Sequence, residues 1–165
     1  MKIIQAGHAS YSTMKGSWAG AMGQTQFMPS SFLQYAEDHN GNGKANIWSE
    51  KHDVFASIAN YLKNAKWNDQ VTWGRKVSVE YKIPKRMLGI KKKYSLQTWH
   101  DLGVRKYNGK ELPKVSNITA SLIMHNDDPK QSYLVYSNYN SIMKWNRSLY
   151  FASAVGILSD SIVNK

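Results

Sequence analysis

The sequence predicts a mainly α-helical fold with an irregular middle region, and three observations lead to this prediction. Apolar residues recur at three- and four-residue spacing in the first third of the chain and again near its end, which is typical of helices that bury one face. Between residues 67 and 115 this spacing is lost, and repeated Gly and Pro residues interrupt the chain. Two short apolar runs, 120–124 and 132–136, then flank a polar turn, which predicts a small β-hairpin.

Two helices are predicted within residues 30–65. The first begins at Ser30 or Ser31, whose hydroxyls can cap it, and ends at the polar turn of residues 39–43. The second begins at Asp53 and runs for about twelve residues. Its apolar residues share one face, which we expect to point at a core: Val54, Phe55, Ile58, Tyr61, Leu62 and Ala65.

Three further helices are predicted in the rest of the chain. A short one, Ser95 to Leu102, lies within the irregular region. Two more, Tyr139 to Trp145 and Leu149 to Val163, are separated by residues 146–148. The sequence shows no internal repeat and no low-complexity tract.

Length and composition narrow the class of protein. A chain of 165 residues is expected to form one domain with a core of its own. It contains no cysteine, which excludes a disulfide framework. The apolar run in the first ten residues is too short for a signal peptide, and no stretch is long enough to cross a membrane.

The chain is strongly basic, with 22 Lys and Arg residues against 11 acidic residues and a net charge of +11. The densest basic run extends from Lys82 to Tyr94. Such a charge favours polyanionic partners, of which nucleic acid is the usual one. No recognition helix, zinc finger or RNP-type motif is present, so nucleic acid is disfavoured. Other anionic partners, such as peptide carboxylates or anionic lipids, explain the charge at least as well.

The segment from Lys15 to Ser31, KGSWAGAMGQTQFMPSS, combines three glycines with uncharged polar residues. Glycine allows the backbone to approach a ligand closely, and side chains such as Ser17, Gln24 and Gln26 suit sugar hydroxyls and amides. The alternative is a turn of small residues at which helices pack. Composition alone leaves both interpretations open.

Residues 38–53 have the spacing of a calcium loop. Asp38, Asn40, Asn42 and the backbone carbonyl of Lys44 match its first, third, fifth and seventh positions, and Gly43 stands at the sixth, where a sharp turn is required. Position twelve holds Ser49 in place of the usual Glu. The loop therefore predicts either a weak Ca²⁺ site, with a dissociation constant on the order of 10⁻⁴–10⁻³ M, or a plain turn followed by a helix capped by Asp53.

Three blocks of sequence resemble the B-type lytic murein transglycosylases, in the same order and over nearly the whole chain. They are GSWAGAMGQTQFMPSS at 16–31, EDHNGNGKANIWSEKHDVFASIANYL at 37–62 and YSNYNSIMKWNRSLYFASAVGIL at 136–158. The resemblance implies a lysozyme-like transglycosylase domain, truncated at its N-terminus. Within it, residues 1–66 would hold the glycan-site segment and the calcium-type loop, 67–137 an irregular region with a small β-hairpin, and 138–165 the C-terminal helices.

The same resemblance implies cleavage of the MurNAc–GlcNAc bond of peptidoglycan with formation of a 1,6-anhydro end. In this family one glutamate in an E-[ST]-x-[FWY]-G motif carries the chemistry, and none of the four glutamates here lies in that motif. We therefore expect no catalytic residue in this chain and no activity from it alone. The alternatives are a non-catalytic murein-binding remnant and a basic nucleic-acid-binding or structural protein.

The resemblance also implies binding residues. It places Ser17, Gln26 and Asn146 at positions that contact glycan, and it puts Phe151, with Tyr150 beside it, where the family commonly has a substrate-positioning tyrosine. For the calcium loop it adds Asp53 as the closing carboxylate to Asp38, Asn40, Asn42 and Lys44.

The resemblance further implies the cellular setting. Full-length relatives act in the periplasm or at the envelope. The expected partners are peptidoglycan strands and, as an open alternative, an upstream polypeptide that carries the glutamate. No organic cofactor is implied.

Overall fold

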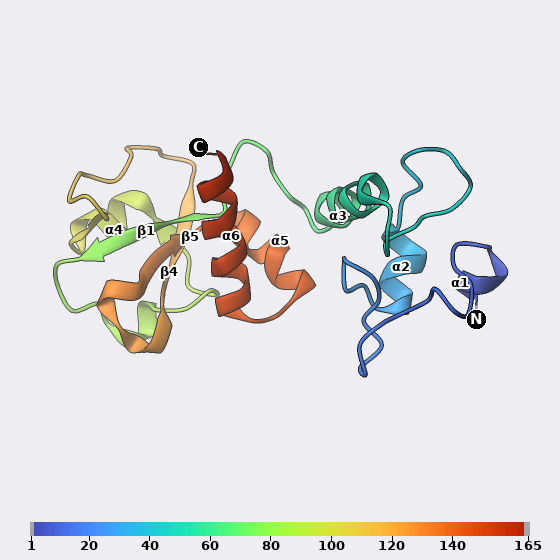
Figure 1. The fold of residues 1–165 in the computed structure, drawn as a ribbon. Coiled ribbons are helices and arrows are strands. Elements are labelled where there is room, and N and C mark those ends of the chain that lie inside the picture. Colours follow the sequence, from blue (N-terminus) through green and yellow to red (C-terminus); the bar gives the residue numbers. More distant parts are fainter. Residues whose placement is uncertain (1, 164–165) are drawn as a thin grey trace. The chain divides into compact units, whose positions relative to one another are not determined.

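The computed structural model describes residues 2–163, and its chain forms two compact units, Met1–Ala65 and Lys66–Lys165 (Figure 1). Each unit has its own secondary structure and its own buried residues. They are therefore described one after the other.

The first unit is helical, with long connecting segments. It contains α1 (Lys2–Gln5), α2 (Pro29–Tyr35) and α3 (Lys51–Asn64). The predicted serine cap of α2 is wrong, because the helix begins at Pro29, whose fixed φ suits the first turn. It also ends earlier than predicted, since Ala36 is already extended.

The helix α3 begins two residues before Asp53, which lies in its first turn and is completely buried. One residue departs from the predicted core face: Phe55 is 67% exposed. The buried residues of the helix include Val54 and Ser57. The polar Ser57 is therefore buried, whereas Phe55, which was predicted to face the core, is not.

The core of the first unit is small and aromatic. Phe32 of α2 packs against Trp48 with ring centroids 5.6 Å apart, and Tyr61 of α3 packs against Phe27 at 5.7 Å and Tyr35 at 4.8 Å. These contacts join the glycine-rich segment, α2, α3 and the loop between the two helices into one body.

The second unit contains a five-stranded antiparallel sheet, which corrects the prediction of a mainly α fold with one small hairpin. Its strands follow the order β2-β4-β5-β1-β3. They are β1 (Gly74–Val79), β2 (Tyr94–Ser95), β3 (Val104–Lys106), β4 (Thr119–Met124) and β5 (Ser132–Val135). The predicted hairpin is confirmed as the pairing of β4 with β5, and β1 and β3 extend it on the far side of β5.

Successive side chains of the central strands β4 and β5 point to opposite faces of the sheet, so each face has its own core. Leu122 of β4 and Leu134 of β5 pack with Trp99 of the short helix, while Ile123 and Tyr133 point to the opposite face. Both faces are therefore covered, which explains why these strands read as continuous apolar runs.

The helices of the second unit match the prediction closely. The short helix α4 (Leu96–Asp101) begins after Ser95, whose hydroxyl accepts a hydrogen bond from the Thr98 amide at 3.0 Å. At the end of the chain, α5 (Ser137–Trp145) and α6 (Leu149–Val163) pack together. They supply Tyr139, Ile142 and Ala152 to the core that contains Ile123 and Tyr133.

The turns between the strands contain three short 3₁₀ helices: η1 (Lys85–Met87), η2 (His125–Asp127) and η3 (Pro129–Gln131). Within residues 2–163 none of the helices is both long enough and apolar enough to cross a bilayer.

Candidate functional site

The glycine-rich segment of the first unit folds back on itself twice. Gly16 and Phe27 each form a β-bridge with Met22, so the chain makes two tight reversals within twelve residues. At the first reversal, the Ser17 hydroxyl accepts a hydrogen bond from the Ala21 amide at 3.2 Å. Trp18 stands at this turn and is fully exposed.

Gly23 lets the second reversal press against a neighbouring segment. Its φ is +60°, and a Cβ at this position would lie 2.6 Å from the Ile47 carbonyl oxygen. The adjacent Gln24 donates from its backbone amide to that same oxygen at 2.8 Å and from its side chain to the Trp48 carbonyl at 2.9 Å. The Trp48 indole in turn donates to the Lys15 carbonyl at 2.7 Å, which holds the start of the glycine-rich segment against the loop that contains Trp48.

Gln26 has a left-handed backbone, with φ of 53°, which is uncommon for a residue with a side chain. Its side-chain nitrogen donates to the Gly23 carbonyl at 2.9 Å. The side chain is exposed, and its amide oxygen is available to accept a hydrogen bond. Strained backbone of this kind is often found at binding sites.

The loop of residues 38–53 turns its side-chain oxygens onto its own backbone amides. Asp38 accepts from the amides of Asn42 at 3.1 Å and Gly43 at 2.6 Å, Asn40 accepts from the Asn42 amide at 3.1 Å, and Asn42 accepts from the Lys44 amide at 2.9 Å. This pattern gathers the side-chain oxygens of alternate residues on the inside of one turn, and such oxygens are the ligands that Ca²⁺ prefers.

Asp53 joins the two ends of this loop. One of its carboxylate oxygens accepts from the His39 amide at 2.9 Å and the other from the Asn46 amide at 2.8 Å. Each oxygen keeps a second lone pair. The side-chain oxygens of this loop are therefore of the kind that binds a cation. Among them, only those of Asp38 and Asp53 carry negative charge. Among residues 2–163 no group of three or more His, Cys, Asp or Glu side chains is clustered for metal binding.

In the second unit, Asn146 ends α5 and leads into α6. Its side-chain oxygen accepts from the Ser148 amide at 3.1 Å, so its side-chain nitrogen is left to donate. Ser148 caps α6 by accepting from the Phe151 amide at 3.2 Å. Phe151 is 36% exposed and offers an apolar ring edge where a tyrosine would offer a hydroxyl.

Tyr150 points elsewhere, as expected from the turn of about 100° between adjacent helical residues. Its hydroxyl donates to the side chain of Asn126 in η2, and its ring stacks on His125 with centroids 4.5 Å apart. The hydroxyl of Tyr150 is therefore occupied within its own unit.

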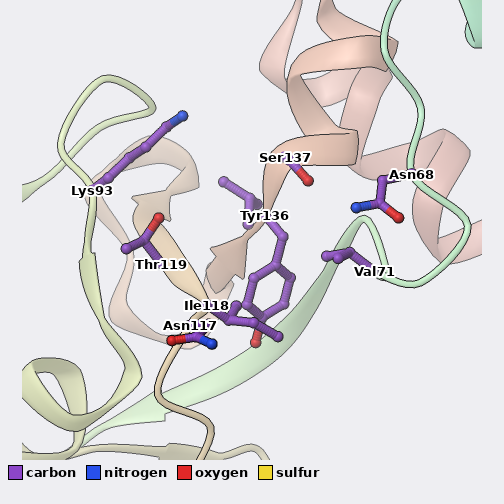
Figure 2. Close-up of a pocket in the computed structure, with 9 residues that line it drawn as sticks. Asn68, Val71, Lys93, Asn117, Ile118, Thr119, Tyr136 and Ser137 are labelled. Carbon is purple, nitrogen blue, oxygen red and sulfur yellow. The ribbon is translucent and has the colours of Figure 1, made fainter.

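The second unit also contains a cavity that the sequence did not predict. This cavity of about 220 Å³ lies where α5 begins, and Figure 2 shows Asn68, Lys93, Thr119, Tyr136 and Ser137 around it. The Asn68 side-chain oxygen accepts from the Gln70 amide at 2.9 Å, which leaves its nitrogen to donate. The residues that line the cavity include one cation, Lys93, and no acidic residue. They come from four separate segments that share no motif, which is why the sequence did not indicate the cavity.

No glutamate of the described chain has the enclosed setting of a general acid. Glu80 pairs with Arg105 at 3.7 Å, Glu111 lies 3.7 Å from His100, and Glu50 lies 3.3 Å from His52. Glu37 is exposed. General acids of glycosidases are usually carboxyl groups shielded from water, and these four are not.

The sequence profile of a family described as the transglycosylase SLT domain matches residues 1–160. Membrane-bound lytic murein transglycosylase B of Escherichia coli strain K12 is 35% identical over 152 residues, which cover 90% of this chain and 40% of that protein.

Two crystal structures have the same fold as this chain. SltB3 from Pseudomonas aeruginosa in complex with NAG-NAM-pentapeptide superposes with a TM-score of 0.93 at 40% identity, over 99% of this chain and 44% of SltB3. The Escherichia coli lytic transglycosylase Slt35 in complex with calcium superposes with a TM-score of 0.73 at 32% identity, over 91% of this chain and 46% of Slt35. The chain thus spans less than half the length of each of these relatives.

Proposed function

Because the chain belongs to the transglycosylase SLT domain family of lytic murein transglycosylases, we propose that it binds the glycan strands of peptidoglycan as part of such an enzyme. The observation that supports this most directly is the set of exposed, uncharged polar side chains held in place by backbone hydrogen bonds. The complex of SltB3 with NAG-NAM-pentapeptide agrees with this ligand class.

The hydrogen bonds already made leave three residues with defined roles. Ser17 accepts from Ala21 and can donate its hydroxyl proton, Gln26 donates to Gly23 and can accept, and Asn146 accepts from Ser148 and can donate. Hydroxyl and acetamido groups of an amino sugar need both donors and acceptors. Phe151 and the exposed part of the Tyr150 ring would add apolar contact with a sugar.

In this proposal the chain contributes binding and positioning, and the proton transfer belongs to a carboxyl group that its four glutamates do not supply. The reaction would be cleavage of the MurNAc–GlcNAc bond, with attack of the MurNAc 6-hydroxyl on the anomeric carbon. Since general acid catalysis typically contributes about 10²–10⁴-fold, these 165 residues alone should release no anhydro-muropeptides from sacculi. Mass spectrometry of the digest checks this, and product formation at enzyme-like rates would contradict it.

The proposal is tested by NMR titration with a soluble NAG-NAM-peptide fragment. Gln26→Ala and Asn146→Ala should each weaken binding, because each removes an amide group that can bond to a sugar hydroxyl or acetamido group. Gln34→Ala and Asn64→Ala are matched controls, since both residues are exposed on helices outside the proposed site. Equal affinity in all four variants, or no binding by the wild type, would overturn the proposal.

We further propose that the 38–53 loop holds one Ca²⁺ in a structural role, through Asp38, Asn40, Asn42, the Lys44 carbonyl and Asp53. The calcium complex of Slt35 supports this choice of ion. The ion would supply positive charge to the inside of the loop and stabilise its fold. We also propose that the protein works at the cell envelope, where its substrate lies.

Calcium at about 10 mM should stabilise the first unit by about 1.4 kcal/mol if the dissociation constant is about 1 mM. The melting temperature should therefore rise with Ca²⁺ and much less with Mg²⁺, and Asp38→Ala should abolish the rise. Asp69→Ala, at an exposed aspartate outside the loop, serves as the control. A melting temperature that ignores Ca²⁺ would favour the plain turn.

A further inference from the structure

A buried chain of hydrogen bonds connects the 3₁₀ helix η2 to the start of α6. His125 Nε2 lies 2.9 Å from Ser153 Oγ, Ser153 Oγ lies 3.0 Å from Tyr139 Oη, and Tyr139 Oη lies 2.7 Å from the Leu149 carbonyl oxygen. All three side chains are buried, with His125 6% exposed, Ser153 3% and Tyr139 not at all. The motifs of the sequence give no role to any of the three.

The direction of every proton in this chain follows from its last member. A carbonyl oxygen can only accept, so Tyr139 donates to Leu149. Tyr139 must then accept from the Ser153 hydroxyl, and Ser153 must accept from His125. The ring of His125 therefore carries a proton on Nε2.

Two tyrosine rings hold the imidazole of His125 in position. Tyr133 of β5 meets it edge-on at 5.7 Å, and Tyr150 of α6 stacks on it at 4.5 Å. Tyr150 also donates to Asn126, the residue next to His125, whose φ is 54°. The start of α6 is thus attached to η2 at two places, Tyr150 in the first turn and Ser153 just beyond it.

We propose that His125 is a positioning residue for the glycan-binding end of α6. Ser153 and Leu149 lie on the first turn of this helix or just beyond it, so the bonds of the chain set the rotation of the helix about its own axis. That rotation determines where Phe151 points and how the turn containing Asn146 leads into the helix. The proposal rests on the function proposed above for Asn146 and Phe151.

The first experiment reads the tautomer of His125 by ¹⁵N NMR and needs no ligand. The wild type should show the Nε2–H form in the neutral ring. Ser153→Ala and Tyr139→Phe each remove one hydroxyl from the chain and should shift the tautomer population and the signals of the Asn146 side-chain amide and the Phe151 ring. Ser161→Ala is the matched control, because this serine lies on α6 and bonds only within the helix, to Ile157 at 2.8 Å.

The second experiment repeats the titration with the NAG-NAM-peptide fragment. Loss of the chain should weaken binding about fivefold, the effect of roughly one hydrogen bond, in Ser153→Ala and Tyr139→Phe but not in Ser161→Ala. Thermal unfolding shows that each variant is folded at the temperature of the titration. Tyr139→Phe decides the question if Ser153→Ala does not fold.

The two experiments separate failure of this inference from failure of the proposed function. If the wild type binds no murein fragment, the proposed function is wrong, and the tautomer and the Asn146 and Phe151 signals still decide the role of His125. A neutral ring protonated on Nδ1, or variant spectra in which those signals do not move, would overturn the positioning role.

Discussion

Single glycines of the first unit differ sharply in what their backbone requires. Gly23 has both a left-handed φ and no room for a Cβ, whereas Gly7 has a similar φ of +77° with open space around it. Gly23→Ala should therefore destabilise the first unit by about 2–5 kcal/mol, from backbone strain together with the clash against Ile47. Gly7→Ala should cost only about 1–2 kcal/mol. Denaturant unfolding with hydrogen exchange at first-unit amides measures both, and equal effects would contradict this account.

The buried His125 should make the stability of the second unit depend on pH. Burial lowers the pKa of His125 below its ordinary value, so in this range the unfolded chain binds more protons than the folded one. Its neutral ring contributes stability that is complete above a pH of about 6.5 and is lost as the pH falls from there toward the lowered pKa of the folded state.

Urea unfolding at several pH values checks this expectation by comparing the wild type with His125→Phe. The variant should lack the part of the decline that belongs to His125. The side chains in contact with the ring are Ser153, Tyr133 and Tyr150, and none of these three is a carboxylate, an ammonium or a guanidinium group. Parallel stability curves for the two proteins would show that His125 titrates without coupling to folding.

For single residues, the sequence predicted which polar residues belong to the proposed site better than it predicted the hydrogen bonds they make. The glutamines and the asparagine of the proposed site stand out by composition, but Gln26 folds back onto Gly23 and Asn146 onto Ser148, and no pattern indicates this. The role of His125 could not be predicted either, because its partner Ser153 lies 28 residues away.

Among the elements, α6 depends on a close approach to Trp73, the residue just before β1. A Cβ on Gly156 would lie 2.2 Å from the ring of Trp73, so only glycine lets the helix lie on that ring. Trp73 also donates from its indole to Asp160 at 3.1 Å, one turn farther along the helix. This packing supports the helix whose first turn carries Phe151.

Gly156→Ala should therefore destabilise the second unit by about 1–3 kcal/mol or more, through overpacking. Helix propensity predicts the opposite sign, since alanine is about 1 kcal/mol better than glycine inside a helix. Ser161→Ala on the same helix should change little. Urea unfolding followed by tryptophan fluorescence separates the two effects, and a stability unchanged or raised by Gly156→Ala would mean that the helix shifts freely over Trp73.

The elements that were predicted correctly are those with a local signal. The hairpin of β4 and β5, the capped helix α4 and the two terminal helices each have an apolar period or a turn within a few residues of their partner. The strands β1, β2 and β3 were missed. β1 contains GRKVSV, with two charged residues, and its partner β5 lies more than fifty residues away. Non-local pairing of this kind decides a strand that local propensity does not.

At the scale of the whole molecule, the net charge of +11 offers a competing explanation for any binding that is observed. A polyanion held by surface lysines releases counterions, so its affinity falls steeply with salt. A sugar held by amides and hydroxyls releases none. The salt dependence therefore distinguishes the proposed glycan contacts from simple charge attraction.

Between 50 and 200 mM salt we expect the affinity for a soluble NAG-NAM disaccharide to change less than about twofold, whereas binding to single-stranded DNA, where it occurs, should fall by tenfold or more. Replacing Lys91, Lys92 and Lys93 with glutamine should weaken the DNA interaction and leave disaccharide binding intact, because these exposed lysines lie outside the proposed site. Fluorescence titrations of both ligands at each salt concentration measure this. A disaccharide affinity that falls in parallel with that for DNA, or disappears in the lysine variant, would show that charge alone attracts the glycan, and the roles given to Gln26 and Asn146 would then have to be abandoned.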